Sequence, residues 1–253
     1  MNRMPTPLVY ELTLNRTELG NYDAAVALFR NRFFGREEGG TNVPQVWIEV
    51  NLQRALELAR TSRCKDALAV ATSLGSPMPD LVFTHDGLAT WLNSARTNFM
   101  LGEVSLACGQ NKEADEMFRR SAQATGASDV VWASASARKL DGYDPAQWRA
   151  GLTAALSQAE SNVETGGSSG WWLYTAGVLQ MALGNTQKGK VLLHRQCLHR
   201  KPECLITSAA WHLRKLHLKL NLNNFDVSQC CRCAGKPQCS RQTESPPEES
   251  AGS

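Results

Sequence analysis

The side chains best suited to metal or thiol chemistry gather near the end of the chain. Six of the eight cysteines and four of the five histidines lie between positions 194 and 239 of the 253-residue sequence. These are His194, Cys197, His199, Cys204, His212, His217, Cys230, Cys231, Cys233 and Cys239. Cysteine and histidine are the ligands of structural zinc, but the segment offers no clean pair of C-x-x-C motifs. We therefore expect no bound metal and no cofactor.

The same part of the chain is strongly basic. Residues 190–241 hold ten Lys or Arg and only two acidic residues, and the last twelve residues are rich in Pro, Glu and Ser. Nucleic acid is one possible partner for such a segment, but the cations alternate with leucines in "HLRKLHLKLNL" and lack aromatic stacking partners. We favour a frayed or aberrant tail, including one translated in a shifted frame. One helix is predicted near 205–220, and residues 223–253 are predicted to be disordered.

The rest of the sequence lacks an arrangement typical of an enzyme. His85 is the only histidine before residue 190, and no glycine-rich phosphate loop precedes a predicted helix. The adjacent carboxylates Glu37 and Glu38 lie in a glycine-rich connection, where acids are usually solvated. We predict that the protein is not an enzyme.

The longest apolar runs, "VVWASASA" and "GVLQMALG", are shorter than the ~20 residues of a membrane-spanning helix, so no membrane association is expected. The first residues show no apolar core followed by a cleavage site, which predicts a cytoplasmic protein unless the N-terminus is incomplete. Cys64 and Cys108 lie alone in apolar helical pattern, and we predict that they are reduced core thiols.

A spacing of small residues recurs along the chain. The pattern is a glycine or serine, a small residue five positions later, and a third residue four positions after that. It occurs at Gly20, Ala25 and Phe29, at Ser62, Ala67 and Ala71, at Gly109, Ala114 and Phe118, and at Gly184, Gly189 and Leu193. Each copy follows one helical run and opens another. The first residue is therefore predicted to turn the chain between two helices, where glycine adopts a positive φ without strain.

Close packing explains the second residue of the pattern. Two antiparallel helices joined by a short turn approach most closely at a fixed depth, and only small side chains fit there. The facing residues, seven positions before each turn, are Thr13, Ala55, Gly102 and Gly177. All are small, as this packing requires. The large third residue, Phe29, Phe118 or Leu193, is predicted to fill the space toward the next helix pair, and the small Ala71 makes the second copy an exception.

Helical periodicity predicts five hairpins and one additional helix. The expected helices are 8–18 and 22–34, 45–60 and 64–74, 87–107 and 110–124, 128–140 and 145–164, 171–183 and 185–199, and 205–220. Asp86-Gly87 and Asp144-Pro145 are start signals, since Pro suits a first helical turn behind an Asp cap. The small-residue rule fails between 128 and 164, where Gln147 takes the place of alanine, so this hairpin is expected to be irregular.

The pattern resembles the tetratricopeptide repeat. Leu101-Gly102, Gly109, Ala114 and Phe118 match its leucine-glycine, glycine, alanine and aromatic signature, and Leu12, Gly20, Tyr22, Ala25 and Phe29 match it nearly as well. Departures are turn-to-turn spacings of 42, 47 and 75 residues instead of ~34, and Arg54 and Ala176 in place of leucine. The resemblance implies an all-α fold over residues 1–222, an α-solenoid of antiparallel hairpins with long helices. The alternative is a set of unrelated hairpins that share a packing rule.

A second resemblance rests on "NRFFGREEGGTN" and "GGSSGWWLYTAGVLQMALG". These segments are similar to the C-terminal helical repeat region of large bacterial proteins of unknown function that carry an N-terminal mutarotase-like domain. The similarity covers residues 1 to about 200. It implies an accessory helical portion of a carbohydrate-active or sugar-binding protein, with a missing N-terminal β domain as its partner.

In tetratricopeptide-like stacks the first helix of each pair lines a concave groove, and the residue ten positions before the turn points into it. Here these residues are Tyr10, Leu52, Phe99 and Tyr174, and Trp171 would extend the surface. The resemblance implies a non-catalytic protein-interaction scaffold that binds a peptide, a helix or a partner domain in this groove. The alternative is that the long helices fold these side chains into their own core.

Overall fold

A computed structural model of the chain describes residues 5–30, 32–34, 43–76, 81–83, 88–165 and 170–199. Most of the described residues are helical, which confirms the all-α prediction. The helices are α1 (Thr6–Glu18), α2 (Tyr22–Ala27), α3 (Val43–Arg60), α4 (Cys64–Ser73), α5 (Leu88–Leu92), α6 (Ala95–Ala107), α7 (Asn111–Ala122), α8 (Val130–Ala137), α9 (Pro145–Glu164), α10 (Gly170–Ala182) and α11 (Thr186–His199). Two short strands accompany them, β1 (Arg32–Phe34) and β2 (Leu81–Phe83).

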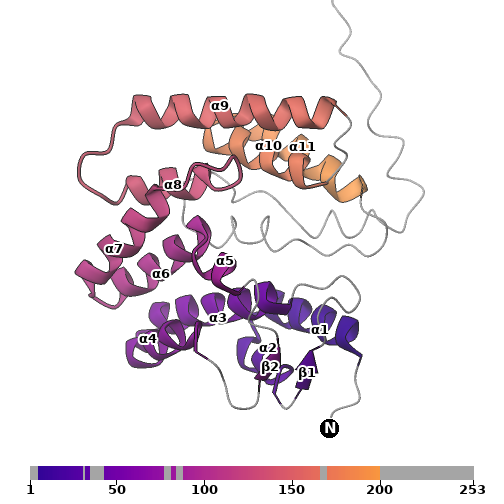
Figure 1. The fold of residues 1–253 in the computed structure, drawn as a ribbon, viewed down its shortest axis with the longest axis vertical. Helices are drawn as coiled ribbons and strands as arrows, with labels where there is room; N and C mark the ends of the chain where they lie inside the picture. The colour runs from indigo at the N-terminus through magenta and orange to yellow at the C-terminus, as the bar shows by residue number, and fades with distance from the viewer. Residues whose placement is uncertain are drawn as a thin grey trace, which may run out of the picture.

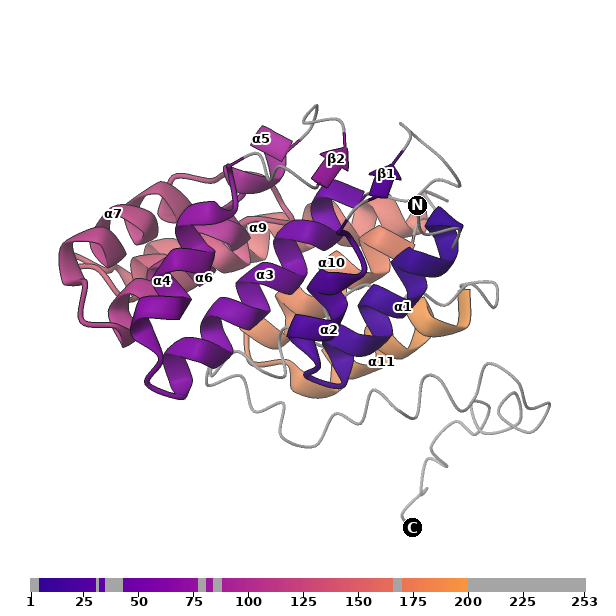
Figure 2. The ribbon, with the colours of Figure 1, turned by 90° about the horizontal axis from the view of Figure 1, so that it is seen from below.

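In the part of the chain that the structure describes, four pairs of successive helices pack against each other. The pairs α1/α2, α3/α4, α6/α7 and α10/α11 lie against each other, with the N-terminal pairs at one end and α9, α10 and α11 at the other (Figure 1). Seen from below, α1, α3, α4 and α6 lie side by side (Figure 2). Helix α3 contacts α1, α2, α4, α5 and α6, so it forms the centre of the N-terminal half.

The predicted turn residue has the predicted conformation in all four copies. The φ angles are +77° at Gly20, +61° at Ser62, +76° at Gly109 and +92° at Gly184. In the third copy the Gln110 N–H donates to the Ser105 carbonyl at 2.9 Å, and the equivalent bond is 2.8 Å long in the other three turns. This bond satisfies a carbonyl that the end of a helix would leave without a partner. One local device therefore makes four hairpins.

The paired small residues are buried in every copy. Thr13, Ala25, Ala55, Ala67 and Ala114 have no exposed surface, and Gly102, Gly177 and Gly189 are buried as well. A Cβ atom built on Gly189 would lie 2.7 Å from the carbonyl oxygen of Gly177, a distance that real Cβ atoms do not tolerate. The backbones of α10 and α11 touch at this point, which confirms the packing argument for that pair.

The third residue of the pattern differs from the prediction in two copies. Phe29 does reach the next pair, where its ring lies 5.4 Å from that of Trp47 in α3. Phe118 and Leu193, however, cover the small residue of their own hairpin: a Cβ atom on Gly102 would lie 2.6 Å from the Phe118 ring, and one on Gly177 would lie 2.8 Å from Leu193. A facing glycine leaves a hollow that the large side chain of the same hairpin fills.

We expect Ala114→Leu to lower the free energy of unfolding by about 1–3 kcal/mol, because three extra carbons must enter the crossing of α6 and α7. Urea titration followed by circular dichroism measures the change. Glu116→Leu on the same helix is the matched control, since this side chain is exposed. Equal urea midpoints for the two variants would show that Ala114 is not at a close helix crossing.

Several predicted helix boundaries are wrong. The helix predicted over 22–34 ends at Ala27, and Arg32–Phe34 instead pairs in parallel with Leu81–Phe83, with Arg32 opposite Leu81. The helix predicted over 87–107 is split, because the Ser94 hydroxyl accepts a hydrogen bond from the Thr97 N–H at 3.2 Å and caps α6. The cap predicted at Asp144 is confirmed, with Oδ1 accepting from the Ala146 N–H at 2.9 Å.

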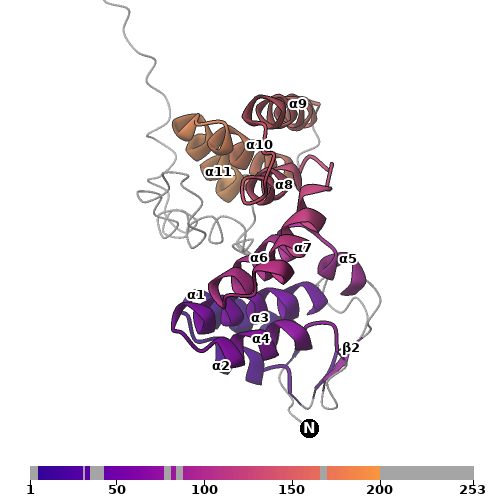
Figure 3. The same cartoon turned by 90° about the vertical axis from the view of Figure 1, so that its left-hand side faces the viewer.

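The hairpin predicted between 128 and 164 is not formed as a close pair. Helix α8 packs mainly on α6 and α7, whereas α9 packs mainly on α10 (Figure 3). The buried side chains accordingly form two clusters, and α8 contributes Trp132 to the first and Val131 to the second. Helix α8 is therefore the element that joins the N-terminal and C-terminal halves.

Other predictions lie outside the described residues. These are the helix at 205–220, the tail at 223–253, the start signal Asp86-Gly87, the carboxylates Glu37 and Glu38, His85, and all of the Cys and His cluster after His199. Among the described helices, none is long and apolar enough to cross a membrane.

Candidate partner-binding site

The structure separates the five residues predicted to line a groove. Leu52 and Phe99 are 0% and 2% exposed, and Tyr174 is 8% exposed. Tyr10 is partly buried, and Trp171 is 49% exposed. The groove prediction is therefore wrong for Leu52, Phe99 and Tyr174, whose side chains pack internally, as the alternative had it.

The neighbours of these residues give the physical reason. The Phe99 ring lies 5.9 Å from Phe118 in its own hairpin and 5.6 Å from Trp132 in α8. Residues 46–53 of α3 are buried without interruption, so all sides of this helix are covered and Leu52 has no open face to reach. Helix α3 is enclosed along these residues, so it cannot line an open groove there.

The structure instead brings together a charged pair from α3 and α6, which are the first helices of two neighbouring pairs. Glu49 on α3 forms an ion pair with Arg96 at the start of α6, and their side chains are 5% and 20% exposed. One turn along α3, the Gln53 side-chain amide donates to Glu49 Oε1 at 3.1 Å. Charges this far from water are retained only when they are paired and hydrogen-bonded. The pair therefore ties α3 to α6.

An aromatic ring lies against the Arg96 guanidinium. Its Cζ atom lies 5.6 Å from the centre of the Trp132 ring on α8, a cation–π arrangement. Its Nη2 atom is buried and makes no hydrogen bond within the described part of the chain. Arg96, on α6, thus contacts α3 and α8 and still has donor capacity.

Tyr174 on α10 adds the fourth helix. Burial raises the pKa of its hydroxyl well above the ordinary value, Arg96 lowers that pKa, and Glu49 raises it, so the phenol lies within electrostatic reach of the ion pair. Its ring centre is 6.0 Å from that of Trp171, which is half exposed. We call the set of Glu49, Gln53, Arg96, Trp132, Tyr174 and Trp171 the Arg96 cluster.

A buried serine links the start of α6 to α8. Ser121 on α7 is fully buried, and its hydroxyl donates to the Ala95 carbonyl at 2.8 Å and lies 3.4 Å from the Trp132 carbonyl. Ala95 immediately precedes Arg96. One hydroxyl therefore fixes the start of α6 and the ring-bearing turn of α8 relative to each other.

The sequence analysis named Tyr174 and Trp171 as groove residues, and it did not name Glu49, Gln53, Arg96, Trp132 or Ser121. The available signal was the stretch "VWIEVNLQRAL", in which an acid and an amide four positions apart interrupt an apolar run. Two such polar residues share one face of a helix, and a polar face on a central helix requires a partner. The identity of that partner was not visible in the local pattern.

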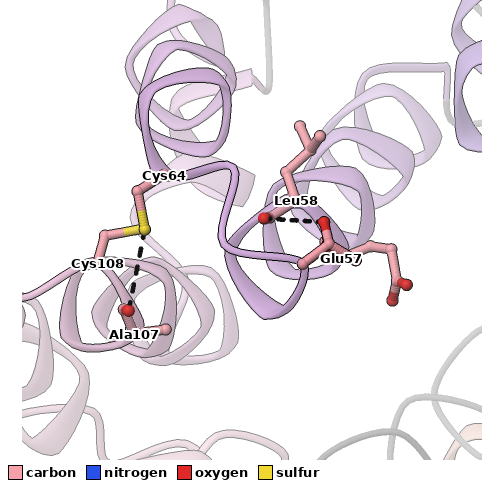
Figure 4. The surroundings of a disulfide bond; sticks show 6 residues. Glu57, Leu58, Cys64, Ala107 and Cys108 are labelled. Atoms are coloured by element: carbon pink, nitrogen blue, oxygen red, sulfur yellow. Dashed lines mark hydrogen bonds between the residues drawn. A yellow bond between two sulfur atoms is a disulfide. The ribbon is translucent and has the colours of Figure 1, made fainter.

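The two isolated cysteines form a disulfide, so their prediction as reduced core thiols is wrong. Cys64 is the first residue of α4, Cys108 follows the last residue of α6, and their Cα atoms are 5.3 Å apart (Figure 4). Both residues are only partly buried. The Sγ atom of Cys64 lies 3.9 Å from the Ala107 carbonyl oxygen. The bond joins two helix ends, although the apolar pattern of the sequence predicted that both cysteines occupy core positions.

Within the described residues, no three His, Cys, Asp or Glu side chains lie close enough together to hold a metal ion. The Arg96 cluster combines a largely buried ion pair, a cation–π contact and one tryptophan ring that is half exposed. Comparisons with family models, with curated proteins and with solved structures find no match to this chain.

Proposed function

We propose that the protein is a non-catalytic protein-interaction scaffold, built as a tetratricopeptide-like solenoid of long helices. The support is the repetition of one device in four hairpins: a positive-φ turn, the same backbone bond across it, and a buried pair of small residues. Repeated pairs that each bury a face on their neighbours are the basis of such stacks.

Ion pairs between successive elements support the same proposal. Arg54 departs from the leucine of the repeat signature, and its guanidinium pairs at 2.6 Å with Asp23 of the preceding hairpin. Lys139, just after α8, pairs at 2.8 Å with Glu103 of α6. The first bond links two neighbouring helix pairs, and the second links α6 to the residues that follow α8. The departure at Arg54 is thus consistent with a scaffold whose neighbouring pairs are held in a defined order.

The observation that carries the proposed binding role is the exposure of Trp171, the member of the Arg96 cluster at the surface. Scattered exposed leucines need no explanation, but tryptophan, tyrosine and arginine are the residues that dominate protein interfaces. Here all three types lie together, with Trp171 at the surface and Tyr174 beneath it. We place the partner contact at Trp171, with a partner that buries an apolar side chain on the indole.

Trp171→Ala should weaken binding of a purified partner about thirtyfold or more, since a tryptophan at an interface hot spot contributes about 2 kcal/mol or more. A photo-reactive amino acid at position 171 identifies the partner, and titration calorimetry then compares the variants. Leu106→Ala is the matched control, because Leu106 is 42% exposed and is not part of the Arg96 cluster. Equal affinities for both variants, with unchanged helicity, would contradict the assignment.

A further inference from the structure

The Cys64–Cys108 disulfide lies at the turn ends of two consecutive helix pairs. Cys64 follows the positive-φ residue Ser62 by two positions, and Cys108 immediately precedes the positive-φ residue Gly109. The bond therefore joins α4, the second helix of one pair, to α6, the first helix of the next. It holds together the turn ends of two neighbouring hairpins.

The surroundings of this bond are accessible. Both cysteines are partly buried, while Arg63, Lys65 and Gly109 beside them are exposed. A small thiol or the active site of a reductase can approach a disulfide placed at the outer end of two helices, whereas a disulfide inside a core is shielded.

Helix α4 is also held by apolar packing in the N-terminal core. Ala67, Val70 and Leu74 bury their side chains in the N-terminal core on the turns of α4 that follow Cys64. After reduction, these contacts keep the two thiols near each other. The bond can therefore form again without refolding of the chain.

The two sulfur atoms occupy opposite helix ends, which makes them unequal. Cys64 is at the N-terminus of the ten-residue α4, where free backbone N–H groups stabilise an anion. Cys108 is at the C-terminus of α6, where carbonyl groups disfavour one. Cys64 is consequently the better leaving group, and an attacking thiolate is directed to Cys108.

We propose that the Cys64–Cys108 disulfide is a reversible redox tether, which fixes the turn ends of two neighbouring helix pairs when oxidised and releases them when reduced. A thiolate of a dithiol reductant attacks Cys108 Sγ, the S–S bond breaks, and Cys64 leaves as a thiolate. The second thiol of the reductant then displaces Cys108. The reductant ends as a disulfide, and the protein gains two electrons and two protons.

The tether acts on the helix pairs that carry the buried ion pair. Glu49 is on α3 and Arg96 is on α6, so the hairpins joined by the disulfide are also those joined by these charges. Release of the turn ends leaves the Glu49–Arg96 ion pair between α3 and α6 in place. Reduction should therefore loosen the start of α4 and leave the helices intact.

Mass spectrometry of the full chain, incubated in dithiothreitol and quenched by alkylation, measures the fraction of peptide that contains the Cys64–Cys108 bond. Limited trypsin digestion measures cleavage after Arg63 and Lys65, with cleavage after the exposed Arg149 on α9 as the internal control. We expect full reduction without denaturant, unchanged helicity, cleavage at Arg63 or Lys65 faster by about tenfold (1.4 kcal/mol of easier opening), and reversal on reoxidation.

Two variants make the result specific. In Cys64→Ser/Cys108→Ser, cleavage should be equally fast with and without reductant. A variant with serine at the six cysteines after residue 190 should behave as the native chain does, which separates the tether from the tail. A brief exposure to glutathione should trap glutathione on Cys108 with Cys64 alkylated. Reduction only in denaturant, or reduction with unchanged cleavage after Arg63 and Lys65, would overturn the proposal.

Discussion

Glu49→Ala should lower the free energy of unfolding by about 3–5 kcal/mol, because it leaves the largely buried Arg96 cation without its partner. The side chains of this pair are 5% and 20% exposed, so water cannot replace the lost carboxylate fully. The variant also removes the acceptor of the Gln53 amide. Urea unfolding monitored by circular dichroism gives the change.

A double-mutant cycle isolates the pair itself. Glu49→Leu combined with Arg96→Met removes both charges at similar volume, and such replacements are often close to neutral. We expect the double variant to be more stable than either single variant. Glu57→Ala, a less buried acid on the same helix, serves as the control and should change stability by about 0.5 kcal/mol or less. A loss below about 1 kcal/mol for Glu49→Ala would mean that the pair behaves as a surface salt bridge.

Removal of the disulfide should lower the free energy of unfolding by about 4 kcal/mol. The two cysteines are 44 positions apart, and a cross-link that closes a loop of this length restricts the unfolded chain by about that amount. The comparison is between the oxidised native chain and Cys64→Ser/Cys108→Ser, by urea titration without reductant.

Reductant provides the control for this measurement. It should lower the urea midpoint of the native chain to that of the double variant, and it should leave the midpoint of the double variant unchanged. Identical midpoints for the native chain with and without reductant would show that the bond contributes nothing to stability. Because this effect acts mainly on the unfolded chain, it is independent of whether the bond also restrains the native hairpins.

The hairpin turns were predictable because their causes are local. A positive φ at Gly20, Ser62, Gly109 and Gly184 and the bond across each turn involve residues within six positions of one another. The crossing depth follows from the length of the turn, so the small partners seven positions before it could be counted. The Asp144 cap is equally local. In each of these cases the residues that cause the feature are neighbours in the chain.

Tertiary structure decided which neighbour covers each helix face. Periodicity places Leu52 and Phe99 on the inner side of their helices, but it does not say whether that side is open, and α8 closes it over Phe99. The same limit applies to the residue at which a helix ends. Residues 32–34 form a strand and not a helix because a strand more than forty positions later offers hydrogen bonds.

The charged and covalent links needed the fold for the same reason. Glu49 and Arg96 lie on different hairpins, as do Cys64 and Cys108, and an isolated acid or thiol in an apolar pattern indicates only that a partner is required. Each pair forms because the stacking of α3, α4 and α6 brings together side chains that are more than forty positions apart. Local spacing contains no information on that distance, since it depends on how one hairpin packs on the next.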